Sequence, residues 1–194
     1  MAEASSSSAT THYCTVDLGI TLPGCELHEV STSQLATWVA RVVETEGPIH
    51  EDIVGRRIAL AVGVTRKGSR IQSAMSAAIT YVLRGGEIKR RGKFLHYLGG
   101  SLQVRDRSRL DSAERGVEHI CPEEIELAIQ ETLKVTHGVE AQEVETLVAR
   151  QFGISRAGKD VRTVLSSQVK RLRRSCRIIE RQGFLEWVDS PDPV

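Results

Sequence analysis

Apolar residues recur at helical spacing in six stretches of the chain, and these stretches form two sets of three. In each set, two short segments of alternating apolar residues follow the third stretch and are joined by a turn, which in the first set contains Gly92. Ser33 precedes the first stretch, and we expect it to cap that helix. The apolar positions of the first set are Leu35, Val39, Val42 and Val43; Ile53, Val54, Ile58 and Ala61; and Ile71, Met75, Ile79 and Val82. Those of the second set are Ile125, Ile129 and Leu133; Val144, Leu147 and Val148; and Val161, Leu165, Val169 and Leu172.

The two sets are copies of one unit. Gly63-Val64-Thr65-Arg66-Lys67-Gly68 returns 90 residues later as Gly153-Ile154-Ser155-Arg156-Ala157-Gly158, and the hairpin pair Phe94-Leu95 returns as Phe184-Leu185. An offset that stays constant over some 65 residues indicates an internal repeat. The order helix, short strand, helix, helix, hairpin is typical of a winged helix-turn-helix. We therefore predict an α+β, mainly α, protein with two tandem winged helix-turn-helix units, each of three helices and a short β-hairpin wing.

Composition shifts place the boundaries between these units. Residues 1–12 are rich in Ser, Ala and Thr and are predicted to be disordered, and residues 13–33 form an irregular lead-in. The first unit spans residues 34–103. A highly charged linker at residues 104–120 is expected to loop over the surface. The second unit spans residues 121–189, with Pro122 in the first turn of its first helix, and residues 190–194 form a frayed tail.

Bulk composition excludes several classes of protein. The 194 residues carry a formal net charge of +1, so any electrostatic function must come from local patches. No segment approaches the roughly 20 apolar residues of a membrane span, and the first residues lack the apolar core of a signal peptide, so we expect a cytoplasmic protein that does not contact membranes. In that compartment the four cysteines are expected to be reduced. No dimerisation element is visible outside the two units, so we expect a monomer.

Catalytic chemistry has little support in the sequence. No Walker loop, HExxH, GxSxG or paired CxxC motif is present, and we predict a non-enzymatic protein without a cofactor. His12, Cys14, Cys25 and His28 have a spacing that could hold zinc, but it is looser than usual structural knuckles, and unrelated lead-in residues are the simpler interpretation. His50 precedes Glu51 and Asp52 at a helix start, where a capping residue followed by acidic residues is expected without any catalytic role.

Nucleic-acid contact is favoured by the third helix of the second unit. Opposite its apolar face lies a stripe of cationic and small polar side chains, and further cations stand before the helix and on the wing. Such a stripe is most often an ordinary solvated face, but here it coincides with the recognition helix and wing of the predicted fold. The candidate nucleic-acid-binding residues are Arg156, Lys159, Arg162, Ser166, Lys170, Arg173, Arg174 and Arg181.

The corresponding helix of the first unit is polar but nearly uncharged, whereas its wing is basic. We expect Lys67, Ser69, Arg70 and Gln72 to approach bases, and Arg90, Arg91 and Lys93 to contact the phosphate backbone.

The repeated turn before the third helix allows two interpretations. Arg66 and Arg156 stand just before a helix N-terminus, where each would either clamp a phosphate or pair with an acidic residue and brace the turn. Gly68 and Gly158 are expected to permit the tight turn itself.

Several runs of the chain resemble a bacterial domain of unknown function. They are Glu26–Val30, Glu46–Asp52, Arg56–Ala59, Arg66–Ile71 and Val104–Ser108. The resemblance extends over residues 13–188, is specific over residues 44–71 and is loose in the second unit. That domain is found at the C-terminal end of large superfamily 1 DNA helicases, some of which also carry a Vsr-like endonuclease domain. The present chain has no helicase motor and no nuclease motif.

The resemblance implies an accessory role beside DNA-processing machinery, in defence against foreign DNA. It supplies no catalytic residue. We therefore expect a non-catalytic module that binds duplex or forked DNA and positions it for a helicase or nuclease. The alternative is a module whose winged helices dock a helicase or nuclease protein, and the near-neutral charge is consistent with it. A dimeric transcriptional regulator is a third possibility.

Overall fold

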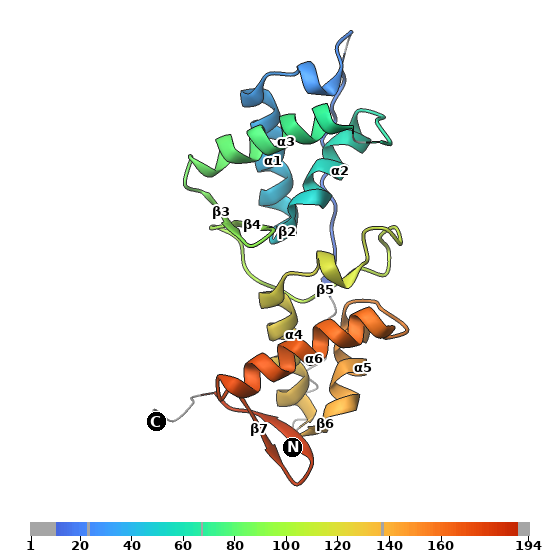
Figure 1. Ribbon diagram of the computed structural model, residues 1–194, viewed down its shortest axis with the longest axis vertical. Coiled ribbons are helices and arrows are strands. Elements are labelled where there is room, and N and C mark those ends of the chain that lie inside the picture. The colour runs from blue at the N-terminus through green and yellow to red at the C-terminus, as the bar shows by residue number, and fades with distance from the viewer. Residues whose placement is uncertain (1–10, 23, 67, 137, 190–194) are drawn as a thin grey trace, which may run out of the picture. The chain divides into compact units, whose positions relative to one another are not determined.

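The computed structural model describes residues 11–22, 24–66, 68–136 and 138–189, and these fold into two compact units (Figure 1). The N-terminal unit consists of Cys14–Leu102 and Glu118–Cys121. The C-terminal unit consists, among the described residues, of residues 11–13, Gln103–Val117 and residues 122–189. Residues 11–13 therefore belong to the C-terminal unit although they precede the N-terminal unit in sequence, and Glu118–Cys121 belongs to the N-terminal unit although it follows Gln103–Val117. The α+β, mainly helical class predicted from the sequence is confirmed.

The N-terminal unit begins with a single 3₁₀ turn, η1 (Leu27–Glu29), and then builds three helices and a small sheet. The elements are α1 (Thr32–Glu46), β2 (Ile49–His50), α2 (Glu51–Ala61), α3 (Ser69–Leu83), β3 (Ile88–Arg91) and β4 (Phe94–Tyr97). The antiparallel sheet has the order β2-β4-β3, so the hairpin β3–β4 is extended by the short strand between the first two helices.

The C-terminal unit repeats this order of elements and the antiparallel sheet, in which the strands follow the order β6 (Val139–Glu140), β8 (Phe184–Trp187) and β7 (Ile178–Arg181). Even the strand register is repeated, because Ile49 lies opposite Leu95 and Val139 lies opposite Leu185, 90 residues later in both cases. The elements are α4 (Pro122–Thr136), β6 (Val139–Glu140), α5 (Ala141–Gln151), α6 (Lys159–Arg174), β7 (Ile178–Arg181) and β8 (Phe184–Trp187).

Apolar side chains from the three helices and the sheet pack together in the middle of each unit and are buried from water, as the periodicity predicted. In the N-terminal unit the fully buried positions include Leu35, Val39, Val42, Val43, Val54, Ile58, Ala78 and Leu95. In the C-terminal unit they include Ile125, Ile129, Val144, Val148, Leu165, Leu172 and Leu185.

Two local expectations about helix starts were wrong. The N-cap of α1 is Ser31, whose hydroxyl accepts a hydrogen bond from the Gln34 backbone N–H, while Ser33 lies inside the helix. Gly68 and Gly158 have φ of −74° and −67°, an extended backbone that any residue adopts, so the turn does not require glycine there. The positive φ falls instead on Gly63 (77°) and Gly153 (75°), which follow α2 and α5.

The charged segment 104–120 does not simply loop over the surface. Arg105 and Asp106 form strand β5, which pairs in parallel with β1 (Thr11–His12), and η2 (Val117–His119) closes the segment. Arg107 is only 2% exposed, because its guanidinium is satisfied by a buried carboxylate. Composition alone does not distinguish such a paired charge from a solvated one.

No helix in the described part of the chain has both the length and the apolar character needed to cross a membrane.

Candidate nucleic-acid interface

The exposed face of α6 is the most cationic helix surface of the C-terminal unit. Leu165, Val169 and Leu172 anchor α6 to the core. Because 3.6 residues make one turn, Lys159, Thr163, Ser166 and Lys170 fall on the opposite side. Its N-cap Gly158 carries no side chain, so the first backbone N–H groups of the helix face solvent unscreened. Figure 1 shows α6 running across α4 and α5 to the β7–β8 hairpin.

A groove of about 600 Å³ runs along this face. Every residue that lines it belongs to α6, and none is acidic: they are Lys159, Arg162, Thr163, Ser166, Ser167 and Lys170. Four of the residues selected from the sequence therefore lie together on one surface. One carboxylate does reach the groove, because the Ser166 hydroxyl donates a hydrogen bond to Glu145 of α5.

The cations of α6 differ in how far their charge is already neutralised. Arg173 Nη2 lies 2.6 Å from Glu180 Oε2, and Arg171 Nη2 lies 2.7 Å from Glu126 Oε2. Lys159, Arg162, Lys170 and Arg174 are exposed and form no ion pair within the described residues, and Arg162 Nε donates a hydrogen bond to the Ala157 carbonyl. The charge available to an external anion is therefore concentrated on these four side chains.

The hairpin next to α6 adds a further cation. Arg181 is 70% exposed and lies 3.7 Å from Glu186, a loose contact in solvent. The ion pair between Arg173 and Glu180 joins the last turn of α6 to strand β7, so hairpin and helix form one continuous surface.

The sequence leaves two interpretations open for the arginine before each third helix: it clamps a phosphate, or it pairs with an acidic residue and braces the turn. Arg66 and Arg156 are exposed, and neither makes an ion pair within the described part of the chain. No acidic partner that would brace the turn is therefore found there.

The corresponding groove of the N-terminal unit is lined in part by acidic residues. Its volume is about 370 Å³, and besides Gln72 and Ser76 of α3 it is lined by Glu51 and Asp52 of α2. Arg90, the cation at its edge, lies 3.0 Å from Glu51 and is partly neutralised. Of the other candidates in this unit, Ser69, Arg70, Arg91 and Lys93 are exposed, and Lys67 lies outside the described residues.

A buried charge cluster in the C-terminal unit could not be located from the sequence. Glu124, 0% exposed in the first turn of α4, accepts hydrogen bonds from Arg107 Nη1 and Nη2 and from Arg105 Nη2, each at 2.8 Å. The Tyr13 ring covers both guanidinium groups, at 4.7 Å and 5.0 Å. Burial by itself raises the pKa of the Glu124 carboxyl, but the hydrogen bonds and charges of Arg107 and Arg105 hold that pKa below its usual value. This cluster fixes segment 103–117 to α4.

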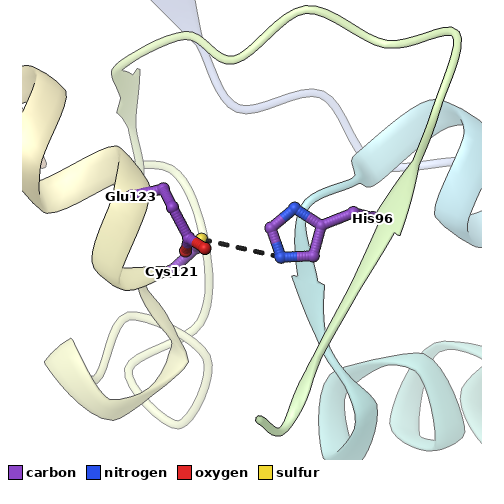
Figure 2. A group of neighbouring side chains, drawn as sticks. All are labelled: His96, Cys121 and Glu123. Atoms are coloured by element: carbon purple, nitrogen blue, oxygen red, sulfur yellow. Dashed lines mark hydrogen bonds between the residues drawn. The ribbon is translucent and has the colours of Figure 1, made fainter. Parts of the chain in front are cut away.

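Histidines gather on the outer face of the N-terminal sheet, where Glu118–Cys121 packs. His50 caps α2 by accepting a hydrogen bond from the Asp52 backbone N–H, as predicted, and its ring lies 5.2 Å from both Phe94 and His119. Figure 2 shows His96 directed toward Cys121, with 4.0 Å between Nε2 and Sγ. Glu123, also drawn there, belongs to the C-terminal unit. Burial lowers the pKa of His50, so this ring stays neutral in the folded protein near pH 7.

The lead-in histidines considered as zinc ligands contact carboxylates instead. His12 Nδ1 lies 3.2 Å from Asp106, and His28 Nδ1 lies 3.1 Å from Glu26. Cys14 and Cys25 are exposed and form no disulfide bond.

Comparison with known families gives a match over part of the chain. Residues 25–73 match a family described as a protein of unknown function (DUF3320). The matched segment runs from the lead-in through α1 and α2 to the start of α3, and it contains residues 44–71, where the sequence resemblance is most specific. The chain therefore carries a segment similar to a domain of unknown function. No curated protein and no solved structure gives a significant match.

Proposed function

We propose that this protein is a non-catalytic DNA-binding module built from two winged helix-turn-helix units, with α6 as the recognition helix and β7–β8 as the wing. The observation that carries the proposal is the groove on α6, which is lined only by cationic and hydroxyl side chains. Together with the resemblance to a helicase-associated domain, it supports a role in positioning DNA for a helicase or nuclease.

The dimensions of α6 suit the major groove of duplex DNA. From Lys159 to Lys170 the helix rises about 16 Å, and to Arg174 about 22 Å, at 1.5 Å per residue. A B-DNA major groove about 12 Å wide admits a helix whose flanking cations meet phosphates on both sides. The four unpaired cations of α6 are spread along this length, so they reach separate phosphates rather than compete for one.

The main contact belongs to the C-terminal unit because the equivalent groove of the N-terminal unit repels phosphate. Glu51 and Asp52 correspond to Ala141 and Gln142, while Ser69 and Gln72 correspond to Lys159 and Arg162. The same architecture therefore presents carboxylates in one unit and cations in the other. Arg70, Arg91 and Lys93 remain candidates for a secondary contact.

Charge reversal tests the proposal. We expect the combined variant K159E/K170E/R174E to bind duplex DNA at least about 100-fold more weakly than the unmodified chain. Removing three phosphate contacts also reduces the slope of log affinity against log salt by about 2.7. The matched control is R84E/R109E/R150E, which makes the same charge change at exposed positions outside α6. Fluorescence anisotropy with labelled duplex at several salt concentrations measures both quantities, and equal affinity of the two variants would refute the role of α6.

A second candidate function, docking of a protein partner, is favoured by an apolar groove in the N-terminal unit. This groove, about 490 Å³, lies between α1 and the end of α3 and is lined by Ala36, Ala40, Tyr81 and Val82 among others. In the C-terminal unit, Glu126 and Arg171 stand at the positions of Ala36 and Tyr81 and bridge the two helices with an ion pair. A partner that inserts apolar side chains beside Tyr81 would be captured with little salt dependence and lost on Y81A, whereas DNA binding through α6 would be unaffected.

A further inference from the structure

An exposed aromatic ring stands at the tip of the C-terminal hairpin. Phe184 is 46% exposed, whereas its counterpart Phe94 in the N-terminal unit is 8% exposed. Both residues open the second strand of their hairpin, and both lie opposite an arginine, Arg181 and Arg91 respectively. The sequence pattern is thus the same, and only the surroundings differ.

Phe94 is covered by its own unit. The His50 ring packs edge-on against it at 5.2 Å, and His119 from the segment 118–121 packs against His50 in turn. Phe184 has Glu140 in the place of His50, and none of the aromatic contacts within the described residues involves Phe184. Its ring is therefore available to a ligand.

Single exposed apolar side chains are common, so exposure alone does not indicate a site. Here a second observation accompanies it. Arg181, 70% exposed, is the direct cross-strand partner of Phe184, and side chains paired in this way share one face of the sheet. A cation beside a free aromatic face is the combination with which proteins hold single-stranded nucleic acid: the ring stacks on a base, and the cation meets the adjacent phosphate.

The position of this pair relative to α6 gives it a specific role. Strand β7 begins four residues after the end of α6, and Arg181 lies about 10 Å along the hairpin, at 3.3 Å per residue. The ion pair between Arg173 and Glu180 fixes the hairpin to the last turn of the helix. A duplex that occupies the α6 groove would therefore meet Phe184 beyond the end of the recognition helix.

We propose that Phe184 stacks on an unpaired base where duplex DNA opens into a single strand, with Arg181 holding the neighbouring phosphate. This inference rests on the proposed function, because α6 supplies the duplex contact. It makes a duplex with a single-stranded extension, rather than a continuous duplex, the preferred ligand.

The test compares two labelled DNAs with the same duplex length, one blunt and one with a single-stranded extension at one end, using the full chain. We expect F184A to weaken binding of the extended DNA by about 5- to 150-fold, the range for loss of one stacked base, and to leave the blunt duplex unchanged. F184W keeps a stacking face and should retain the preference. Y81A removes an exposed aromatic residue from the N-terminal unit and serves as the control. Unchanged circular dichroism and thermal melting verify that each variant folds.

A fluorescent base analogue at the first unpaired position reports stacking directly. Its emission should be quenched on binding to the unmodified chain and to F184W, but not to F184A. If both DNAs bind and F184A weakens them equally, or leaves the preference and the quenching intact, the stacking inference is overturned while the DNA-binding function stands. If the unmodified chain binds neither DNA, the proposed function fails and the inference fails with it.

Discussion

Neutralising the buried carboxylate Glu124 should destabilise the C-terminal unit selectively. In E124Q the shape of the side chain is kept, but the amide carries N–H donors that face the guanidinium groups of Arg105 and Arg107, which then lose the counter-charge of Glu124. Breaking a buried ion pair on one side costs about 3–5 kcal/mol. A domain of this size is stable by only about 5–15 kcal/mol, so the loss is a large share of the total.

The chain offers an internal reporter for each unit. Its two tryptophans are Trp38 on α1 of the N-terminal unit and Trp187 on β8 of the C-terminal unit. Urea unfolding followed by fluorescence in W38F and W187F backgrounds therefore reads the two units separately. We expect E124Q to shift the Trp187 transition to lower urea by the equivalent of about 3–5 kcal/mol and to leave the Trp38 transition in place.

The matched control is E126Q, two residues away on α4. Glu126 pairs with Arg171 at 2.7 Å on the surface, so its loss should cost less than about 1 kcal/mol. The reasoning would be refuted if E124Q and E126Q had equal effects, or if both tryptophans reported the same shift for E124Q. The pH dependence has a defined sign as well. Because the pKa of Glu124 is lowered on folding, its contribution is complete above the ordinary value of 4.5 and is lost as the pH falls through the lower folded pKa.

Two further predictions concern local features. Burial lowers the pKa of His50, so as the pH falls below 6.5 the unfolded chain takes up a proton before the folded chain does. Thermal melting read from Trp38 should therefore show the N-terminal unit losing stability below pH 6.5. The variant H50N keeps a capping oxygen and should show a smaller loss over the same pH range. G153A should destabilise the C-terminal unit more than G63A destabilises the N-terminal unit, because a Cβ at Gly153 overlaps Asp106 Oδ1 whereas a Cβ at Gly63 meets open space. G63A should cost about 1–2 kcal/mol, the penalty of a left-handed backbone for a residue with a Cβ. Equal losses of stability for the two variants in urea unfolding would contradict this packing.

The elements that could be predicted from the sequence are those determined by neighbours in the chain. Apolar periodicity located the helices, and the 90-residue offset is reproduced in the strand register. Pro122 begins α4, and His50 caps α2, as local rules require. These features depend on residues a few positions apart, where the chemistry of helix ends is decisive.

The remainder depends on contacts between residues far apart in sequence. Segment 104–120 looks like a solvated linker, because nothing in its composition reveals that Arg107 meets Glu124 seventeen residues later. The same limit applies to the candidate interface: Arg90 and Arg173 look like free cations in the sequence, yet folding places Glu51 and Glu180 beside them. A pattern of charges identifies which face is polar, whereas tertiary structure decides how much of that charge is left for a ligand.

Comparison of the two units at equivalent positions argues against two interchangeable DNA-binding surfaces. Where α6 carries Lys159 and Lys170, α3 carries Ser69 and Thr80, and the carboxylates of Glu51 and Asp52 line the groove beside α3. The ring equivalent to Phe184 is already covered from within the unit. If both units bound DNA equally, charge reversal on α6 would leave about half of the salt dependence in place. Because phosphate contacts require unpaired cations, we expect charge reversal on α6 to remove most of the salt dependence of DNA binding. The feature that distinguishes the N-terminal unit is then the apolar groove beside Tyr81.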